Sequence, residues 1–422
     1  MFKVFKFGGA SLKDAKAVVN MGSIIDRFVH EKLVVVVSAM GKTTNALEAI
    51  FNKAWGRQEY SEEFRSLEKY HIQIANEIFG SPMRSEKVIR PWLEALSGEL
   101  MNLSGAASYD EGYDRIIPYG ELISSSLVYD YLVQTGRKFV FLDARELVIT
   151  DERFRDAGVN WNMSCLKINR IIRVPSAGDF FITQGFIGKS ESGKMTTLGR
   201  EGSDYTASIF AHCLSADSVT IWKDVPGILN ADPKRMPETE LYEKLSYQEA
   251  AEMSYYGATV IHPKTIKPLA DKNIPLYVKS FADPTRPGTL VAAGTVHPLP
   301  PTFIFKDLQC LISFTRKDLE FINEKNLGEI FSSLDRMNLR INLMQNSAVS
   351  FTICVNEDPG KINELIALLS GNFKILYNEG LQLITIKNYT REAIESISRN
   401  KNILVEQRTR NTFQIVIRED QA

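Results

Sequence analysis

The segment Lys6-Phe-Gly-Gly-Ala-Ser11 joins a lysine, two glycines and a serine where a predicted first strand gives way to a helix. Glycines let the backbone approach a bulky anion, and free N–H groups at a helix N-terminus attract phosphate. Lys6 alternates with Phe2 and Val4, so its ammonium group projects from an otherwise apolar strand face. The segment is therefore a candidate phosphate site. Taken alone, it more often marks an ordinary glycine turn that follows a strand ending in lysine.

A second segment, Thr197-Leu-Gly-Arg-Glu-Gly-Ser-Asp204, places an arginine and an aspartate directly before another predicted helix. The planar guanidinium group of Arg200 matches a carboxylate or a phosphate in bidentate fashion. The segment therefore indicates an anion site, although Ser203 or Asp204 would equally serve as a plain helix N-cap.

Three further features are ambiguous when the residues are taken alone. The loop from Trp222 to Lys234 is rich in turn residues, yet it leaves a predicted parallel strand at its carboxyl end, where open α/β sheets bind ligands. The segment Gly188-Lys-Ser-Glu-Ser-Gly-Lys194 nearly matches a P-loop, but Met195 stands where Ser or Thr must hold Mg²⁺, so we expect a hairpin turn. His262 is predicted to be a structural hydrogen-bonding residue and not a catalyst.

The elements that position these segments alternate between β-branched runs and amphipathic stretches over residues 1–295. This order predicts an α/β fold with a mainly parallel central sheet. Continuous apolar runs are typical of parallel strands covered on both faces. Such runs occur at Leu33–Val37, Phe139–Leu142, Phe180–Thr183 and Val219–Trp222. We expect helices at Ser11–His30, Thr43–Lys53, Glu62–Phe79, Gly120–Val133 and Asp204–Cys213, and one from the capping box Ser246-Tyr-Gln-Glu249 to about Tyr255.

The sequence changes character near residue 300. Val296-His-Pro-Leu-Pro-Pro301 holds three prolines, which suits an extended linker over residues 296–304. Residues 305–422 then show a β-α-β-β-α-β order, which is ferredoxin-like, followed by a further strand, a helix and two strands that lack the last helix of a second copy. The predicted strands are 308–316, 339–345, 348–356, 373–377, 381–388, 402–407 and 412–418, and the predicted helices are 325–338, 359–370 and 390–399.

Composition limits the class of protein. The chain has 422 residues, 44% hydrophobic and 24% charged, with a formal net charge of −1. These values exclude collagen-like, largely disordered and membrane-spanning proteins, and they show no basic excess for nucleic acid. The start of the chain has no signal-peptide core, so we expect a cytoplasmic protein without a membrane partner. Four separated cysteines are therefore expected to be reduced thiols: Cys165, Cys213, Cys310 and Cys354.

Taken in order, these segments resemble the aspartokinases of the amino acid kinase superfamily. The resemblance covers nearly all of residues 1–295 and rests on Lys6–Ser11, Val35–Met40, Gly120-Glu121, Ile182–Phe186, Thr197–Ala207, Trp222–Ile228, Asp232-Pro233, Gly257–Pro263 and Pro284–Leu290. Downstream, residues 327–350 resemble the first of the family's two ACT domains. The resemblance implies a three-layer αβα sandwich, the amino acid kinase fold, followed by tandem ACT modules of which the second is shortened. Because no dehydrogenase-sized extension follows, the chain resembles the monofunctional enzymes.

The resemblance implies transfer of the γ-phosphoryl group of ATP to the β-carboxylate of L-aspartate, giving 4-phospho-L-aspartate for lysine, threonine and methionine synthesis. A β-carboxylate with a pKa near about 3.9 is already ionised at neutral pH, so the nucleophile needs no general base. Catalysis then rests on positioning and on charge neutralisation, with Mg²⁺ as the implied metal ion.

Each implied role falls on a numbered residue of this chain. Lys6 would neutralise the transferred phosphoryl group, and Asp204 would orient Lys6 and the acceptor. Aspartate would be held by Thr44, Glu121 at the α-amine, Arg200 at the α-carboxylate, Glu201, Gly202 and Ser203. Nucleotide would be held by Lys6, Gly8, Gly9, Ser11, Lys223, Asp224, Leu229, Lys234, Thr259 and Val260.

Several positions depart from the family pattern. Glu201 replaces the second glycine of Gly-Arg-Gly-Gly-Ser-Asp, where its carboxylate would either repel aspartate or turn outward. Lys223, Leu229 and Thr259 stand where threonine, tyrosine and lysine are frequent, which bears on the implied nucleotide contacts.

The ACT region raises the question of an amino-acid effector. Candidate effector-binding residues are Asn342, Gln345, Asn346 and Ser347. Asn342 and Ala348 stand where lysine-inhibited relatives carry Asp and Glu, which argues against inhibition by lysine. ACT modules tend to pair side by side, so we expect a homodimer or a higher homo-oligomer.

Two other hypotheses stay open beside an active aspartate kinase. One is a superfamily relative that phosphorylates glutamate or a nucleotide. The other is a non-catalytic protein that senses amino acids through a vestigial kinase fold. The intact Lys6, Arg200 and Asp204 favour the active enzyme.

Overall fold

The computed structural model describes residues 2–174, 178–258, 261–294, 299–318 and 320–418. The chain divides into two compact units. Unit 1 comprises Met1–Ile228, Leu241–Ala251 and Val260–Val296, and unit 2 comprises Leu229–Glu240, Glu252–Thr259 and His297–Ala422. Two short segments from within the predicted kinase region therefore cluster with the predicted regulatory region. None of the helices in the described residues is long and apolar enough to cross a bilayer.

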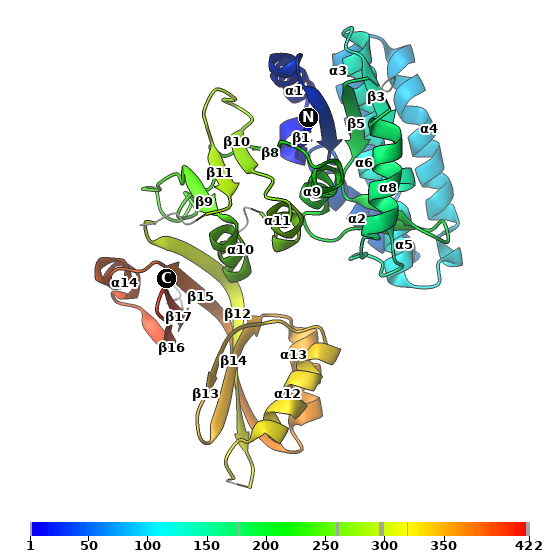
Figure 1. Ribbon diagram of the computed structural model, residues 1–422. Coiled ribbons are helices and arrows are strands. Elements are labelled where there is room, and N and C mark those ends of the chain that lie inside the picture. The colour runs from blue at the N-terminus through cyan, green and yellow to red at the C-terminus, as the bar shows by residue number, and fades with distance from the viewer. Residues whose placement is uncertain (1, 175–177, 259–260, 295–298, 319, 419–422) are drawn as a thin grey trace. The chain divides into compact units, whose positions relative to one another are not determined.

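Unit 1 is built on an eight-stranded sheet (Figure 1). Its order is β3 (Phe139–Leu142), β5 (Phe180–Gln184), β2 (Lys32–Val37), β1 (Phe2–Phe7), β8 (Ser218–Lys223), β10 (Leu276–Ser280), β11 (Thr289–Ala292) and β9 (Lys244–Ser246). Neighbours from β3 to β10 run parallel, and β10 and β11 pair antiparallel. The four apolar runs lie in parallel strands as predicted, and the mainly parallel central sheet is confirmed.

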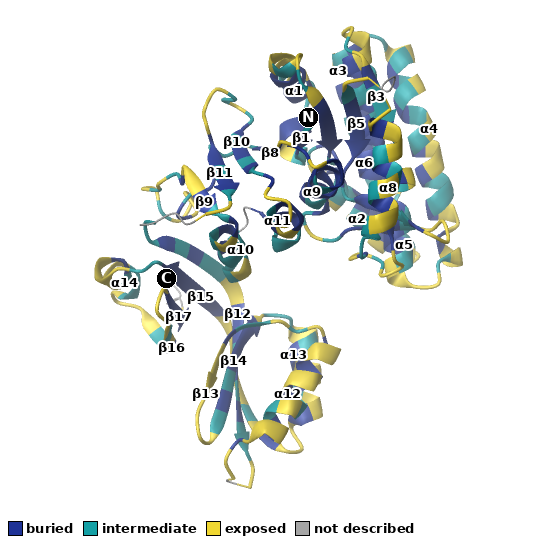
Figure 2. Ribbon diagram, viewed as in Figure 1, coloured by how far each residue is buried: buried dark blue, intermediate teal, exposed yellow. Residues whose placement is uncertain are grey.

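Helices cover both faces of this sheet. On one face, α1 (Ala15–Ile25) and α6 (Tyr119–Gln134) enclose a core with Phe5, Phe7 and Val35, and α3 (Ser61–Phe79) and α4 (Pro82–Met101) pack outside α6. On the other face, α9 (Gly202–Leu214) packs against β1, β2 and β8, flanked by α8 (Trp161–Ile172) and α11 (Pro263–Ala270). Figure 2 shows the central strands buried between these layers, so the αβα sandwich is confirmed.

Local details near the predicted motifs follow the chemistry of the residues. The helix predicted at Ser11–His30 is divided into a short 3₁₀ helix η1 (Gly9–Leu12) and α1, because Asp14 interrupts it and caps α1 by accepting from the Ala17 N–H at 2.8 Å. Helix α2 (Thr43–Trp55) and helix α10 (Tyr247–Tyr256) begin close to where they were predicted. The near P-loop starts within β6 (Ile187–Ser190) and continues through the turn to β7 (Met195–Thr197). The two strands pair antiparallel, so the hairpin prediction is confirmed.

The prediction that all four cysteines are free thiols is wrong. Cys165 of α8 and Cys213 of α9 form a disulfide, whereas Cys310 and Cys354 are free and buried. The two helices pack side by side, and their Cα atoms at these cysteines are 4.7 Å apart. A pairing across 48 residues of sequence depends on that packing, which residue spacing does not reveal.

Unit 2 contains a six-stranded antiparallel sheet. Its order is β13 (Ile341–Asn346), β14 (Ser350–Asn356), β12 (Thr302–Arg316), β15 (Phe373–Lys387), β17 (Thr412–Arg418) and β16 (Asn402–Arg408). Helices α12 (Glu324–Arg336), α13 (Pro359–Leu369) and α14 (Arg391–Ser398) complete it. The order β12-α12-β13-β14-α13-β15 is the predicted ferredoxin-like module.

Two predictions in this region need correction. Residues 302–304 of the predicted linker lie in β12, and residues 296–298 of the linker fall outside the described residues. The strands predicted at 373–377 and 381–388 are one strand, β15, whose pairing with β12 shifts register between Lys306 and Leu311. The first part of β12 pairs with the end of β15, and Phe303 and Phe305 pack in the core beneath α14. The shortened second copy, formed by the end of β15, α14, β16 and β17, therefore gains a fourth strand from the start of β12.

Candidate functional site

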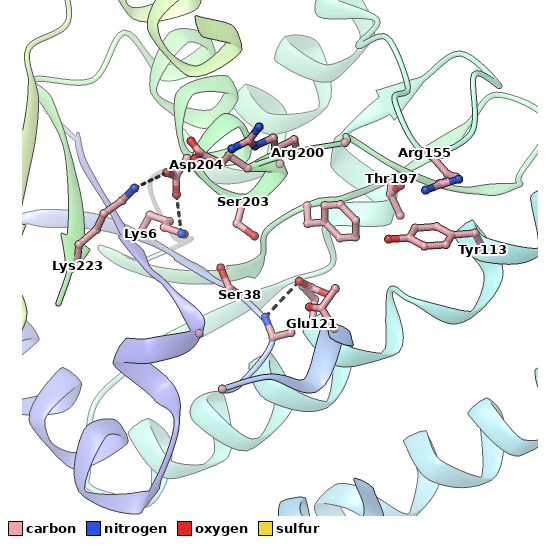
Figure 3. Close-up of a pocket in the computed structure, with 18 residues that line it drawn as sticks. Lys6, Ser38, Tyr113, Glu121, Arg155, Thr197, Arg200, Ser203, Asp204 and Lys223 are labelled. Carbon is pink, nitrogen blue, oxygen red and sulfur yellow. Dashed lines mark hydrogen bonds and ion pairs between the residues drawn. The ribbon is translucent and has the colours of Figure 1, made fainter. Parts of the chain in front are cut away.

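Unit 1 contains a cavity of about 470 Å³ at the carboxyl ends of β1, β2 and β8, facing the N-terminus of α9 (Figure 3). This is the edge at which parallel α/β sheets bind ligands. Its lining brings together ten predicted site residues: Lys6, Gly9, Thr44, Glu121, Arg200, Glu201, Gly202, Ser203, Asp204 and Lys223.

Two lysines converge on one buried carboxylate at one end of the cavity. The Lys6 ammonium lies 2.5 Å from Asp204 Oδ1, and the Lys223 ammonium lies 3.7 Å from Oδ2. Burial alone would raise the pKa of the Asp204 carboxyl, but the two ammonium groups outweigh it and hold the pKa below its ordinary value. Two positive charges against one negative charge leave a net positive charge, which suits a phosphoryl group.

The glycine segment holds the backbone close to the loop after β2. A Cβ atom on Gly9 would lie 2.8 Å from the carbonyl oxygens of Ala39 and Gly41, so only glycine fits there. Gly8 lies next to the Lys6 ammonium group, since a Cβ atom at Gly8 would lie 3.4 Å from the ammonium nitrogen. The Ser11 hydroxyl donates to the Trp222 carbonyl at 3.3 Å and thereby ties η1 to β8. Gly8 and Ser11 support the cavity without being among its lining residues.

Glu121, in the first turn of α6, offers a buried acceptor to a ligand. Its side chain is 3% exposed, and Oε1 accepts from the Ala39 N–H at 3.2 Å. Oε2 has no hydrogen-bond partner among the described residues. Burial raises the pKa of Glu121 to about 8, against the opposing effects of the Ala39 N–H and the Lys6 charge. An ammonium group would satisfy this oxygen and restore the charge of the carboxylate.

Arg200 and Glu201 lie in the turn that precedes α9. Arg200 is exposed at the cavity, and no carboxylate among the described residues pairs with its guanidinium group. Glu201 has a left-handed backbone (φ 53°), and its Oε2 accepts from the His262 N–H at 2.7 Å. The Glu201 carboxylate is therefore engaged by the segment that begins α11. The His262 ring accepts from the Lys264 N–H at 3.2 Å and caps α11, the structural role predicted for it.

The cavity also has lining residues to which the sequence reasoning assigned no role of their own: Ser38, Tyr113, Arg155, Phe186, Thr197 and Gly199. Arg155 (φ 66°) and Phe186 (φ 68°) share with Glu201 a left-handed backbone that side chains rarely adopt. Such strained residues cluster at functional sites. Positive φ at a non-glycine residue has no sequence signature, although Phe186 and Thr197 lie inside segments that resembled the family.

The remaining predicted nucleotide contacts are not assembled in this cavity. Asp224 follows β8 and is exposed. Leu229 and Lys234 belong to the segment Leu229–Glu240 of unit 2. Thr259 and Val260 lie outside the described residues.

The candidate effector residues lie on β13 and in the turn after it. The Asn342 amide donates to Gln309 Oε1 and to Asn356 Oδ1, each at 2.8 Å, and its oxygen accepts from the Lys306 ammonium at 2.8 Å. Gln345 and Asn346 are exposed. The Ser347 N–H donates to the Ser350 carbonyl at 2.8 Å and closes the hairpin between β13 and β14.

The protein itself offers little to a metal ion. The described residues contain no cluster of three or more His, Cys, Asp or Glu side chains that could hold one. Mg²⁺ commonly binds through substrate phosphates, a few carboxylates and water, so a site completed by a nucleotide is compatible with this arrangement.

Comparisons with known proteins agree with this geometry. Residues 1–280 match the amino acid kinase family. The chain is 32% identical over 399 residues to the lysine-sensitive aspartokinase 3 of Escherichia coli (strain K12), an alignment that covers 91% of this chain and 86% of that protein. It is 30% identical over 372 residues to the chloroplastic aspartokinase 3 of Arabidopsis thaliana, covering 85% and 65% respectively. Among solved structures, E. coli aspartokinase III in complex with aspartate and ADP superposes with a TM-score of 0.84 at 27% identity, covering 99% of this chain and 96% of that one.

Proposed function

This chain is a member of the amino acid kinase family and, within it, of the aspartokinases, and we propose that its cavity transfers the γ-phosphoryl group of ATP to the β-carboxylate of L-aspartate. The observation that carries the proposal is the charge arrangement of one cavity. In the part of the chain that the structure describes, a buried carboxylate oxygen of Glu121 has no hydrogen-bond partner and the guanidinium group of Arg200 has no carboxylate partner. Both groups lie in the same cavity as two lysines that converge on one carboxylate.

Aspartate recognition follows from the first pair of groups. The Glu121 carboxylate receives the α-ammonium group, and Arg200 receives the α-carboxylate through its bidentate fork. Together they select an amino acid over a plain diacid. Thr44, Gly202 and Ser203 line the same cavity, and we assign to them the remaining polar contacts of the substrate.

Phosphoryl transfer follows from the lysines. The ionised β-carboxylate oxygen attacks the γ-phosphorus, a new O–P bond forms, and the bond to the β,γ-bridging oxygen breaks as ADP leaves. The difficulty is bringing an anion up to a polyanion, so the ammonium groups of Lys6 and Lys223 neutralise the charge, while Asp204 holds both lysines in place.

Nucleotide binding uses the glycine segment and the end of β8. We assign Gly8, Gly9 and Ser11 to the phosphate side, and Asp224, Leu229, Lys234, Thr259 and Val260 remain predicted nucleotide contacts. Mg²⁺, when bound with ATP, supplies further charge neutralisation. It would be held mainly by phosphate oxygens, since Asp204 is shared by two ammonium groups and Glu121 is assigned to the substrate amine.

The product, 4-phospho-L-aspartate, places the enzyme at the start of lysine, threonine and methionine synthesis. We propose the cytoplasm as its compartment. We propose a kinase domain over residues 1–295 and a tandem ACT region that begins with β12 at Thr302, with pairing of ACT modules in a homodimer or a higher homo-oligomer.

Effector binding at the ACT region remains a proposal. A solved structure of E. coli aspartokinase III, with a TM-score of 0.80 at 27% identity, contains lysine and aspartate. In this chain the amide of Asn342 is already bonded to the ammonium group of Lys306. A second ammonium group would meet a positive charge there, so we expect lysine to bind weakly.

The experiment that tests the function is the hydroxamate assay. Purified protein with ATP, Mg²⁺, L-aspartate and hydroxylamine is expected to give aspartyl hydroxamate, whereas glutamate and UMP, assayed in parallel by ADP release, are expected to give no turnover. Absence of product with aspartate would overturn the proposal, and turnover of either other acceptor in its place would identify another activity of the superfamily. Effector binding measured by calorimetry without ATP binding would indicate a non-catalytic sensor.

A further inference from the structure

Asp114 is a buried carboxylate beside the cavity that no sequence motif identified. It lies on α5 (Tyr109–Ile116) and is fully buried. Its Oδ1 accepts from the Thr197 hydroxyl at 2.7 Å, and its Oδ2 accepts from the Thr197 N–H at 2.8 Å and the Arg155 N–H at 3.0 Å. Hydrogen bonds to an ionised acceptor are stronger than those between neutral groups, so the Asp114 carboxylate fixes the positions of its three donors.

A short turn connects Thr197 to Arg200, the residue that we assign to the substrate α-carboxylate. Thr197 ends β7 and lines the cavity, and Arg200 follows three residues later. Between them, the Leu198 N–H donates to the Phe186 carbonyl at 2.9 Å, and the turn closes where the Gly202 N–H donates to the Gly199 carbonyl at 3.0 Å. Since this turn is hydrogen-bonded from its start to α9, fixing Thr197 fixes the origin of the segment that carries the guanidinium group.

The Arg155 donor belongs to a second turn that packs against the first. A Cβ atom on Gly199 would lie 2.6 Å from Asp156 Oδ1 and 3.1 Å from the Arg155 carbonyl, so the two turns are in direct contact. The left-handed backbone of Arg155 carries a conformational cost, and the bond from its N–H to Asp114 helps to hold it. Its guanidinium group lies 4.6 Å from the centre of the Tyr113 ring.

We propose that Asp114 is a positioning residue for aspartate binding, which joins α5, the Arg155 turn and the Thr197–Arg200 turn and thereby sets the place of the Arg200 guanidinium group. The inference rests on the proposed function. Figure 3 shows Thr197, Tyr113 and Arg155 away from Lys6 and Lys223, so the effect falls on aspartate and not on the phosphate end.

The electrostatics of Asp114 are consistent with this role. Burial raises the pKa of its carboxyl to about 6, while the hydrogen bonds from Thr197 and Arg155 and the Arg155 charge act in the opposite direction. At neutral pH the carboxyl is therefore ionised in most molecules and accepts from all three donors.

Steady-state kinetics of Asp114→Ala and Asp114→Asn test the proposal. Alanine removes every acceptor, so the KM for aspartate is expected to rise at least tenfold while the KM for ATP stays within twofold. Asparagine is expected to restore the aspartate KM to within about threefold of wild type. Its oxygen can accept from both backbone N–H groups while its amide donates to the Thr197 hydroxyl. Asp110→Asn is the matched control, because Asp110 lies exposed on the same helix and pairs with the Arg155 guanidinium group at 3.1 Å.

Each outcome decides between the proposal and a purely structural role. An unchanged aspartate KM in the alanine variant, or equal increases for aspartate and ATP, would overturn it. A failure of asparagine to restore the KM would also count against it. If the alanine variant does not fold, the aspartate KM is measured for Thr197→Val, which removes the hydroxyl donor and keeps the shape. It is expected to rise relative to Thr197→Ser, which keeps the hydroxyl. Loss of activity in the wild type itself would instead refute the proposed function.

Discussion

Replacement of Glu121 by glutamine is expected to weaken aspartate binding much more than nucleotide binding. Glutamine keeps an oxygen that can accept from the Ala39 N–H, so the local hydrogen bond of Glu121 survives. What disappears is the charge at Oε2, the buried atom without a partner among the described residues. The substitution therefore removes the ion pair with the substrate ammonium and leaves the shape of the site intact.

The size of the effect follows from two opposing contributions. Two unit charges about 4 Å apart attract by about 4 kcal/mol at an effective dielectric constant of roughly 20. Burial raises the pKa of Glu121 to about 8, so at pH 7 the carboxyl must first lose a proton, which costs about 1.4 kcal/mol. The remaining ~2.6 kcal/mol corresponds to a roughly 80-fold higher aspartate KM in the variant.

The same proton gives binding a distinctive pH dependence. Below pH 8 the free site is protonated and the aspartate-bound site is ionised, so the affinity of the wild type for aspartate falls as pH falls, approaching tenfold per unit. Aspartate binding at pH 7 should therefore release close to one proton. The glutamine variant should release none and should show a flat profile between pH 6.5 and 8.

Calorimetry in two buffers of different ionisation enthalpy measures the proton release, and steady-state assays measure both KM values. The ATP KM serves as the control and is expected to change less than threefold. An increase of less than fivefold in the aspartate KM would refute the placement of Glu121 at the amine. A wild-type affinity that stays constant between pH 6.5 and 8 would refute the raised pKa.

Other substitutions test the remaining assignments. Lys6→Ala should lower kcat by at least 100-fold while raising the aspartate KM only a few-fold, since its ammonium acts on the transferred phosphoryl group; equal effects on both would remove that role. Arg200→Lys should raise the aspartate KM about tenfold through loss of the bidentate fork, and an unchanged KM would contradict the assignment. Burial lowers the pKa of His71 to about 4, so as pH falls through about 6.5 the unfolded chain binds a proton on this histidine that the folded chain does not bind, which destabilises the fold. The raised pKa values of Glu121 and Asp114 act in the opposite direction, so the effect of His71 is isolated by comparison with His71→Gln: urea unfolding should show the stability of the wild type relative to that variant falling by about 2 kcal/mol between pH 7 and pH 5. Thiol titration of protein denatured without reductant should give two thiols per chain, and four would exclude the bond between Cys165 and Cys213.

Hydrophobic periodicity predicted the strands and helices whose pattern of burial can be seen within the element itself. β2 is apolar over Leu33–Val37 because helices cover both faces of the sheet, and that pattern is local to the strand. Helix α4 was not predicted. It contains Pro91, which removes a backbone donor and is typical of a helix end, yet packing along α3 and α6 keeps all of Pro82–Met101 helical. Tertiary packing outweighs local preference there, and no window of sequence contains that information.

The site residues likewise divide into those that the sequence identified and those that only the fold brings together. Lys6, Glu121 and Arg200 were found because they belong to segments that resemble a family, and the structure places all three at one cavity. Asp114 was missed because its meaning depends on Thr197, 83 residues away in sequence. A lone aspartate in a helix carries no pattern. Its importance arises only when the fold brings three donors to it.

Glu201 shows how a departure from glycine is accommodated. A side chain in the left-handed region costs about 1–2 kcal/mol relative to the ordinary helical region, which is why glycine is common in such turns. Here the carboxylate accepts from the His262 N–H at 2.7 Å, at the start of α11. A hydrogen bond to a charged group contributes about 1.5–3 kcal/mol, which is enough to offset the backbone cost. Because this bond draws the carboxylate to α11, a negative charge next to Arg200 is compatible with a site for an anionic substrate.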